Sequence, residues 1–253
     1  MRRNAEANIV DILFCQCAYA QIIPAERKGR VLAGLAAAGA KCTAVPDLCG
    51  LAARKAPLLA ELAGQSGLKI VACHPRAVRW LFHRASAPLQ PGRFEVFNMR
   101  MQEADEILAR LAPGPQGAAA PPPEAASEGD WIPWFPVIDY ERCTNCKQCL
   151  EFCLFGVYEA DSAGKVTVTN PASCKTNCPA CARICPQAAI VFPKVEDAPI
   201  NGAEVADEAL AHAQAKINIE EILGDNIYAA LAKRRAQRKA LLRKSGAKDG
   251  GQL

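Results

Sequence analysis

The sequence predicts an α/β domain with a parallel sheet, then a small, cysteine-dense α+β domain, and finally a basic helical extension. Strand-like and helix-like runs alternate within residues 1–111, which favours a parallel sheet covered by helices. Residues 112–130 are rich in Pro, Ala and Gly without apolar periodicity, as is typical of a linker. Eight of the 13 cysteines lie within residues 131–200, and residues 201–253 complete the chain.

Four short, mainly apolar segments of the first domain are expected to form strands. They cover Asn8–Cys15, Lys41–Val45, Leu68–Cys73 and Phe94–Met99. The segment LKIVAC at 68–73 has the clearest strand pattern, because it includes the β-branched residues Ile70 and Val71. Helices are expected between and after these strands, over Ala25–Ala40, Leu51–Leu62, Pro75–Arg84 and Gln102–Leu111.

Glycine and proline mark the boundaries of these helices. Gly39 is expected to end the first helix, Pro57 interrupts the second, and Pro75 fits the first turn of the third. The alternation of strands and helices predicts a Rossmann-like or flavodoxin-like sheet. In such folds, binding sites gather in the loops at the carboxyl ends of the strands.

The cysteines and the amino terminus favour a cytoplasmic protein. An odd number of cysteines, clustered in two regions, does not fit a secreted disulfide framework and indicates thiolate metal ligation in a reducing compartment. Arg2 and Arg3 are followed by Asn4, Glu6 and Asp11, so no signal-peptide core is expected. No stretch approaches the about 18 uncharged apolar residues that a membrane span needs.

Two cysteine runs of similar spacing dominate residues 131–200. The first is C-x2-C-x2-C-x3-C, and the second is C-x3-C-x2-C-x3-C followed by Pro186. They contain Cys143, Cys146, Cys149 and Cys153, and then Cys174, Cys178, Cys181 and Cys185. Such a loop wraps three thiolates around one cubane cluster, and the fourth cysteine reaches the other cluster. Four thiolates also suit zinc, but this interleaved spacing is not that of a zinc ribbon.

This pattern resembles the bacterial two-cluster ferredoxin family over about Val137–Pro193. The resemblance implies a ferredoxin-like βαββαβ module with two [4Fe–4S] clusters. It implies that one cluster is held by Cys143, Cys146, Cys149 and Cys185, and the other by Cys153, Cys174, Cys178 and Cys181. Leu154 stands where the family usually has proline, and the second run has one extra residue between its first two cysteines.

The rest of this domain is expected to support the clusters. A hairpin is expected over Gly156–Val168, with its turn near Gly164, and a returning strand over Ile190–Phe192. Burial tunes the potential of such clusters. The apolar side chains expected to shield them are Ile138, Leu150, Phe155, Val157, Ile184, Ile190 and Phe192.

Five cysteines remain in the first domain, and the predicted topology separates them into four and one. Cys15 and Cys17 lie at the end of the first predicted strand. Cys49 follows the second strand and Cys73 ends the third, so a parallel sheet would bring these four to one rim. Cys42 begins its strand and would lie toward the opposite rim. The four thiols could hold an iron–sulfur cluster or a structural zinc, or form a redox-active or merely buried set.

Short motifs follow the predicted strands of the first domain: Cys15-Gln-Cys17, Cys49, Ala72-Cys73-His74-Pro75-Arg76 and Phe97-Asn98-Met99-Arg100. Over residues 8–108 they are similar to the amino-terminal domain of the heterodisulfide reductase A subunit. The similarity implies a third [4Fe–4S] cluster, held by Cys15, Cys17, Cys49 and Cys73. His74 replaces the serine usual in that family, and the sequence after Cys49 does not follow it. No G-x-G-x-x-G follows a strand, so neither a flavin nor a nucleotide is expected.

The carboxy-terminal extension is strongly basic. Residues 227–253 contain eight Lys and Arg against one Asp, so this tail carries +7 of a chain whose net charge is +4. Asn201 is expected to begin a helix with Glu204 in a capping box, and a basic helix is expected over Asn226–Lys244. The tail lacks interleaved aromatic residues and a helix-turn-helix pattern, so a solvated face or an acidic protein partner is favoured over nucleic acid.

The two sets of cluster ligands predict an electron-transfer protein or a subunit of an oxidoreductase complex. It would relay single electrons between a donor and an acceptor oxidoreductase through two or three clusters. No nucleophile–base pair, paired carboxylates or phosphate loop emerges, so no catalytic residue is assigned. One alternative is an iron–sulfur redox sensor that binds nucleic acid through the basic helix. A small disulfide reductase is a further reading, although in the similar complexes other subunits carry that chemistry.

Overall fold

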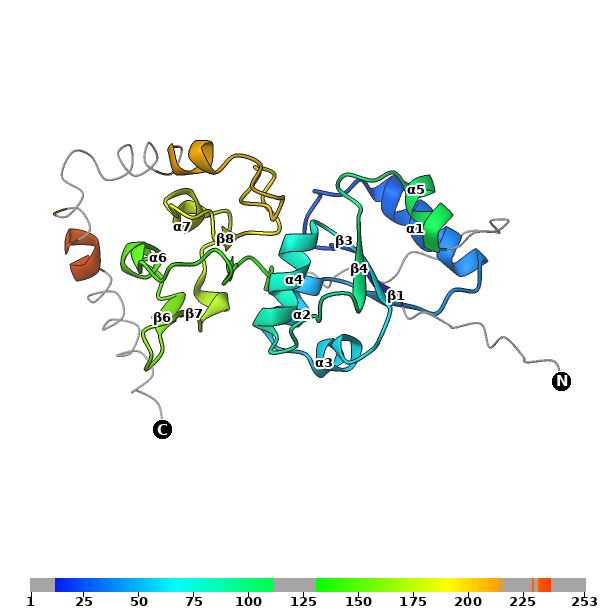
Figure 1. The fold of residues 1–253 in the computed structure, drawn as a ribbon, viewed down its shortest axis with the longest axis horizontal. Helices are drawn as coiled ribbons and strands as arrows, with labels where there is room; N and C mark the ends of the chain where they lie inside the picture. The colour runs from blue at the N-terminus through cyan, green and yellow to red at the C-terminus, as the bar shows by residue number, and fades with distance from the viewer. Residues whose placement is uncertain (1–11, 112–130, 214, 216–228, 230–231, 238–253) are drawn as a thin grey trace. The chain divides into compact units, whose positions relative to one another are not determined.

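The computed structural model describes residues 12–111, 131–213, 215, 229 and 232–237 (Figure 1). The chain divides into two compact units, unit 1 at Met1–Asp130 and unit 2 at Trp131–Leu253. The linker predicted at 112–130 lies outside the described residues, as does most of the basic helix predicted over Asn226–Lys244. Within the described part of the chain, no helix is both long and apolar enough to cross a membrane.

Unit 1 is built on a four-stranded sheet in which all neighbouring strands run parallel. The strands are β1 (Ile12–Cys15), β2 (Cys42–Val45), β3 (Leu68–Ala72) and β4 (Phe94–Asn98), in the order β2-β1-β3-β4. The central strands β1 and β3 are almost completely buried, as expected for parallel strands that are covered on both faces. The predicted parallel α/β fold is thereby confirmed for this unit.

Helices cover both faces of this sheet. In the described residues they are α1 (Ala25–Ala37), α2 (Leu48–Ala53), α3 (Pro57–Ala63), α4 (Pro75–Arg84) and α5 (Ala104–Leu111). Helix α1 packs on α5 and α2 packs on α4, and Figure 1 shows the two pairs on opposite sides of the sheet. The loops that leave the carboxyl ends of the strands lead into α1, α2, α4 and α5.

The second helix differs from its prediction. Leu51 is the predicted start, whereas α2 begins at Leu48 and a separate helix, α3, follows. Asp47 caps α2, because its carboxylate accepts a hydrogen bond from the amide of Gly50 at 2.8 Å. This earlier start places Cys49 in the first turn of a helix, close behind β2.

Gly34 allows α1 to pack closely on α5. A Cβ atom on Gly34 would lie 2.5 Å from Cδ1 of the buried Leu108, whereas a Cβ atom on Gly29 of the same helix would meet nothing within 4 Å. We expect Gly34→Ala to lower the free energy of unfolding of unit 1 by about 1–2 kcal/mol, because its methyl group overpacks the contact. The control Gly29→Ala should raise it by about 0.5–1 kcal/mol through helix propensity. Urea denaturation followed by circular dichroism measures both, and equal stabilities would contradict the close contact.

Unit 2 consists of short elements whose order along the chain is β5-α6-β6-β7-α7-β8. Strand β5 (Val137–Ile138) pairs antiparallel with β8 (Ile190–Val191). The predicted hairpin is confirmed, because β6 (Tyr158–Ala160) pairs antiparallel with β7 (Val166–Val168). Helix α6 (Gln148–Phe152) follows β5, helix α7 (Ala180–Arg183) precedes β8, and a 3-10 turn, η1 (Pro171–Ser173), precedes α7.

The helix predicted to begin at Asn201 begins later. Residues 208–213 are helical, and Asp207 caps them by accepting a hydrogen bond from the amide of Leu210 at 2.9 Å. Asn201 is instead buried in a turn, where its side-chain amide donates a hydrogen bond to the carbonyl of Glu196 at 2.7 Å. The predicted start, with its capping box, is therefore wrong.

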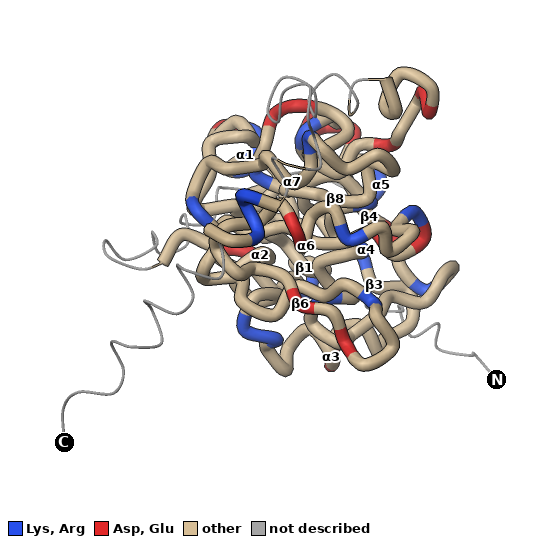
Figure 2. The backbone as a smooth tube through the Cα atoms, turned by 90° about the vertical axis from the view of Figure 1, so that its left-hand side faces the viewer, with Lys and Arg blue, Asp and Glu red and all other residues tan. Residues whose placement is uncertain are grey.

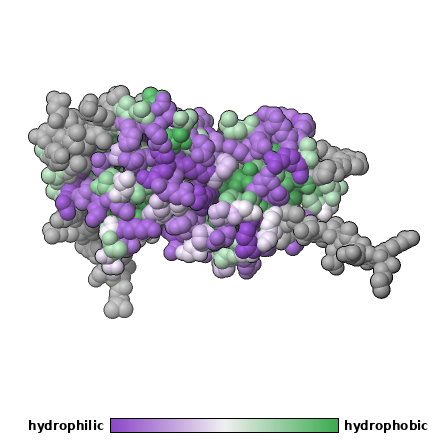
Figure 3. Space-filling view, viewed as in Figure 1, coloured by the Kyte–Doolittle hydropathy of each residue, from purple (hydrophilic) through white to green (hydrophobic). Residues whose placement is uncertain are grey.

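On the face drawn in Figure 3, hydrophilic residues predominate and are interrupted by hydrophobic patches. The large apolar side chains that the described residues expose are Met101, Trp131, Ile132, Phe155 and Leu210. Phe155 was expected to be a shielding residue but is 40% exposed, whereas Val157 and Ile184 are buried as expected.

Candidate metal centres

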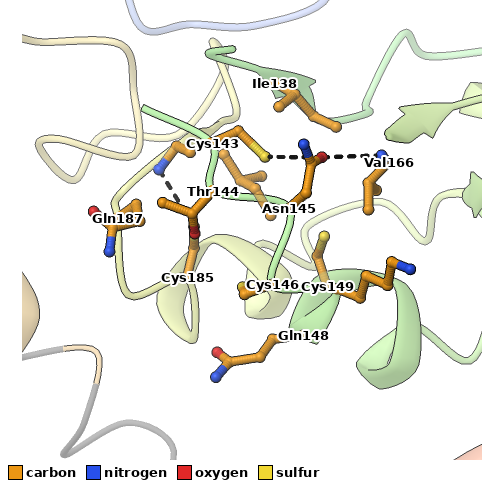
Figure 4. A pocket seen from close by; sticks show the side chains of 13 residues that line it. Ile138, Cys143, Thr144, Asn145, Cys146, Gln148, Cys149, Val166, Cys185 and Gln187 are labelled. Atoms are coloured by element: carbon orange, nitrogen blue, oxygen red, sulfur yellow. Dashed lines mark hydrogen bonds between the residues drawn. The ribbon is translucent and has the colours of Figure 1, made fainter. Parts of the chain in front are cut away.

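Four cysteines line the first pocket of unit 2. Three of them lie in or just before α6, and the fourth lies in the turn that follows α7. The four are Cys143, Cys146, Cys149 and Cys185. Figure 4 shows them arranged around one space, with Asn145 beside Cys143. The structure thus gathers the four residues that the ferredoxin resemblance assigns to one cluster.

The backbone bends the first cysteine loop around this pocket. Asn145 and Lys147 have φ angles of 55° and 65°, in the left-handed region, which turns the chain sharply. The side-chain oxygen of Asn145 accepts a hydrogen bond from the amide of Val166 at 3.2 Å, which ties the loop to β7. The amide of Cys143 donates to the carbonyl of Asp139 at 2.9 Å. Hydrogen bonds on both sides therefore hold the loop in its curved shape.

Burial makes two thiols of the first pocket, those of Cys149 and Cys185, difficult to ionise. It raises the pKa of Cys149 to about 12, and Cys185 adds to this shift because two thiolates repel each other. Burial also raises the pKa of Cys185, although the amide of Ala189 donates a hydrogen bond to its sulfur at 3.3 Å. Such thiols carry negative charge together only when a bound cation compensates it. The donor set therefore fits a thiolate-ligated metal group.

The other four cysteines of unit 2 line a second pocket. They are Cys153, Cys174, Cys178 and Cys181. Cys153 directly follows α6, Cys174 directly follows η1, and Cys181 lies within α7. Each pocket therefore takes three cysteines from one run and one from the other. Among the described residues, no group of three or more Cys, His, Asp or Glu side chains is placed to hold a single metal ion.

A tyrosine hydroxyl supports the second pocket. The hydroxyl of Tyr158 donates a hydrogen bond to the sulfur of Cys181 at 3.1 Å, and both side chains are buried. Burial raises the pKa of Cys181, while the bond from Tyr158 acts in the opposite direction because it stabilises the thiolate. Burial likewise raises the pKa of Cys174 to about 12, and Cys153 and Cys178 add to that shift. No cysteine motif indicates Tyr158, because only the position of the hairpin brings it to the sulfur.

Four cysteines of unit 1 are buried near the carboxyl ends of its strands. Cys15 is the last residue of β1 and Cys17 follows two residues later, with a φ of 49°. Cys49 lies in the first turn of α2, and Cys73 directly follows β3. Cys42 begins β2 at the opposite, amino-terminal end of the strands, and burial raises its pKa to about 11. The structure therefore separates Cys42 from the other four.

Cys15 has close electrostatic contact with its neighbours. Burial raises its pKa well above the usual range, and Cys17, Asp47 and Cys73 add to the shift because their negative charges repel a thiolate. The amide of Leu48 donates a hydrogen bond to the sulfur of Cys15 at 3.3 Å. Three of the four predicted thiols thus lie within electrostatic reach of one another. Asp47, which was not among the predicted site residues, could have been found as a helix-capping residue.

His74 is buried beside Cys73 and is held by Asn98. Nδ1 of the ring lies 3.0 Å from the side-chain nitrogen of Asn98, which can only donate, so the ring accepts this bond and the neutral ring carries its proton on Nε2. Burial lowers the pKa of His74 to about 4, and the positive charge of Arg100 contributes to the shift. At neutral pH the ring is therefore an uncharged, hydrogen-bonded part of the loop after β3.

Comparisons with known proteins concern unit 2. Residues 135–220 match the 4Fe-4S dicluster domain family. This match lies outside residues 8–108, and their similarity to heterodisulfide reductase therefore stays a prediction. An uncharacterised ferredoxin of Methanocaldococcus jannaschii is 52% identical over 63 residues, which cover 24% of this chain but only 42% of that relative. No solved structure matches the chain significantly. The two matches show that unit 2 has a ferredoxin-like 4Fe-4S domain, which supports an iron–sulfur electron-transfer role.

Proposed function

We propose that the protein is an electron carrier, or a subunit of an oxidoreductase complex, that relays single electrons between a donor and an acceptor oxidoreductase. One observation carries this proposal: eight cysteines are sorted into two separate four-thiol pockets within a dicluster domain. A bound [4Fe–4S] cluster supplies a one-electron couple. The part played by the chain is to bind the clusters, exclude water from them and set their electrostatic surroundings.

Each pocket of unit 2 is proposed to hold one cluster through its own four thiolates. The first cluster is assigned to Cys143, Cys146, Cys149 and Cys185, and the second to Cys153, Cys174, Cys178 and Cys181. Buried side chains such as Ile138 and Ile190 line the first pocket, and Val157 and Tyr158 line the second. These side chains cover part of each pocket, and the hydroxyl of Tyr158 places a hydrogen bond on the buried sulfur of Cys181.

Unit 1 is proposed to hold a third cluster through Cys15, Cys17, Cys49 and Cys73. Each of these side chains is at most 8% exposed, and the four approach the rim where parallel sheets usually carry their sites. A structural zinc or a redox-active set of thiols are the alternatives that the same residues allow. Unit 1 would then serve as the docking module through which electrons enter or leave.

The basic extension favours contact with protein over contact with nucleic acid. In residues 232–237, the guanidinium of Arg234 lies over the ring of Phe152, and Arg235 pairs with Glu151. Both partners belong to α6, so two of the positive charges of the tail already contact side chains of unit 2. We therefore rank an iron–sulfur sensor that binds nucleic acid below the electron carrier. Sequence-selective retardation of DNA or RNA by the full chain would reverse this order.

Iron and acid-labile sulfide analysis of the anaerobically purified chain tests the proposal. Three [4Fe–4S] clusters give about 12 iron and about 12 sulfide per chain, whereas two clusters give about 8 of each. We expect about 12 of each. A value of about 8 would remove the third cluster and confine electron transfer to unit 2, and zinc without sulfide would reject the proposed function.

A further inference from the structure

A basic segment from the end of the chain contacts α6, beside the second cysteine pocket. Arg234 is the half-buried residue of the described segment 232–237, whose other side chains are exposed. Its Cζ atom lies 4.3 Å from the centre of the Phe152 ring, within the range of a cation–π contact. The next residue, Arg235, pairs with Glu151 through Nε and Oε2 at 3.3 Å. Two adjacent arginines thus hold two adjacent residues of one helix.

The second pocket has a positively charged lining. Lys175, Arg183 and Arg234 line it, and none of the described lining residues is an Asp or Glu. The first pocket has one charged lining residue, Lys147. Figure 2 views unit 2 from the side of α6 and α7, with basic residues in blue and acidic residues in red. The charges around the two pockets therefore differ.

Arg234 differs from the other two cations of this lining. Lys175 and Arg183 are exposed to water, and Arg183 also faces Asp197 at 3.5 Å. Water and an opposite charge both weaken the field of a cation. The charge of Arg234 is better protected, because its side chain is half-buried and lies against an aromatic ring. Of the three, Arg234 should therefore act most strongly on a group bound in the pocket.

We propose that Arg234 makes the cluster held by Cys153, Cys174, Cys178 and Cys181 easier to reduce. The inference rests on the proposed function, because it requires a [4Fe–4S] cluster in this pocket. When the cluster takes one electron from a one-electron reductant, no bond breaks and its net charge becomes more negative by one. A nearby positive charge stabilises the reduced state more than the oxidised state. The tail would thus set a difference in potential between the two clusters of unit 2.

The test is a redox titration of the iron-loaded, full-length Arg234→Gln variant, followed by electron paramagnetic resonance. We expect the equilibrium constant for reduction of one cluster to fall about threefold to tenfold, on the Coulomb scale for a partly screened charge. A tenfold change is about 59 mV for one electron. The other cluster should titrate as in the wild type. Added salt should shrink the difference between variant and wild type, because it screens the charge.

Lys233→Gln is the matched control, because it removes the same charge from the neighbouring, exposed position. It should leave both potentials unchanged, and Arg234→Lys should keep much of the wild-type value. Tyr158→Phe identifies the affected cluster, because Tyr158 bonds a sulfur of the second pocket and its loss should shift the same signal. Unchanged potentials in Arg234→Gln, or equal shifts in both Gln variants, would overturn the inference. Absence of iron and sulfide from the wild type would instead overturn the proposed function.

Discussion

Cys181→Ala is expected to lose the second cluster and to unfold most of unit 2. The iron content should fall from about 12 to about 8 atoms per chain or lower. Unit 2 should depend on bound clusters for its fold, because α6 and α7 have five and four residues and its strands have two or three. Elements of this length are not stable alone, and the free energy of metal binding then serves as folding free energy. Losing the buried anchor in α7 should therefore disrupt the whole unit.

Limited proteolysis and iron analysis measure this effect. Unit 2 of Cys181→Ala should be cleaved at least about tenfold faster than in the wild type, since cleavage follows the population of open chains. Cys42→Ala is the control, because Cys42 is half-buried and belongs to none of the three four-cysteine sets. It should keep its full iron content. Wild-type iron and protease resistance in Cys181→Ala would show that Cys181 neither binds a cluster nor stabilises unit 2.

Local sequence signals account for much of unit 1. Pro75 defines the start of α4, because proline fits the first turn of a helix, and Gly39, with a φ of 63°, ends α1. The start of α2 escaped prediction, because the residues from Leu48 to Gly50 show no helical periodicity of their own. Asp47 is of a residue type that often caps helices, but only the observed hydrogen bond from the amide of Gly50 shows that it caps α2.

The extension shows how tertiary contacts override a local pattern. Asn201 and Glu204 have the spacing of a capping box, yet the helix begins seven residues later, after Asp207. The buried side-chain nitrogen of Asn201 donates to the carbonyl of Glu196, and its oxygen accepts a hydrogen bond from the amide of Ala203 at 2.8 Å, so the side chain closes a local turn that no helix continues. Burial of this kind depends on the folded chain and leaves no trace in a short sequence window.

The cysteine sets and their surroundings differ in how far the sequence predicts them. The interleaved spacing and its family resemblance assign the eight cysteines of unit 2 to the same two groups that the two pockets contain. The residues that modify the pockets were not predicted. Tyr158 reaches Cys181 only through the position of the hairpin, and Arg234 reaches Phe152 from a distant segment. Such contacts have no fixed sequence spacing, so a motif cannot indicate them.

Cys73→Ala is expected to remove a cluster from unit 1 without unfolding that unit. The iron content should again fall from about 12 to about 8 atoms per chain, but the structural result should differ from that of Cys181→Ala. Unit 1 has a core of its own, in which Leu13, Ile70 and Leu81 are fully buried. Its helices reach 13 residues and its sheet has four strands. Truncating one buried thiol should cost only about 1 kcal/mol of unfolding free energy.

Thermal unfolding and electron paramagnetic resonance of Cys73→Ala and Cys42→Ala separate the possible roles of these thiols. Both variants lose one cysteine from unit 1, but only Cys73 lies at the rim shared with Cys15. If unit 1 holds a cluster, Cys73→Ala alone loses about 4 iron atoms while the signals of unit 2 persist. Equal iron in both variants would mean that the four buried thiols bind no cluster. Because unit 1 has its own core, loss of iron there would reflect loss of a ligand and not collapse of the fold.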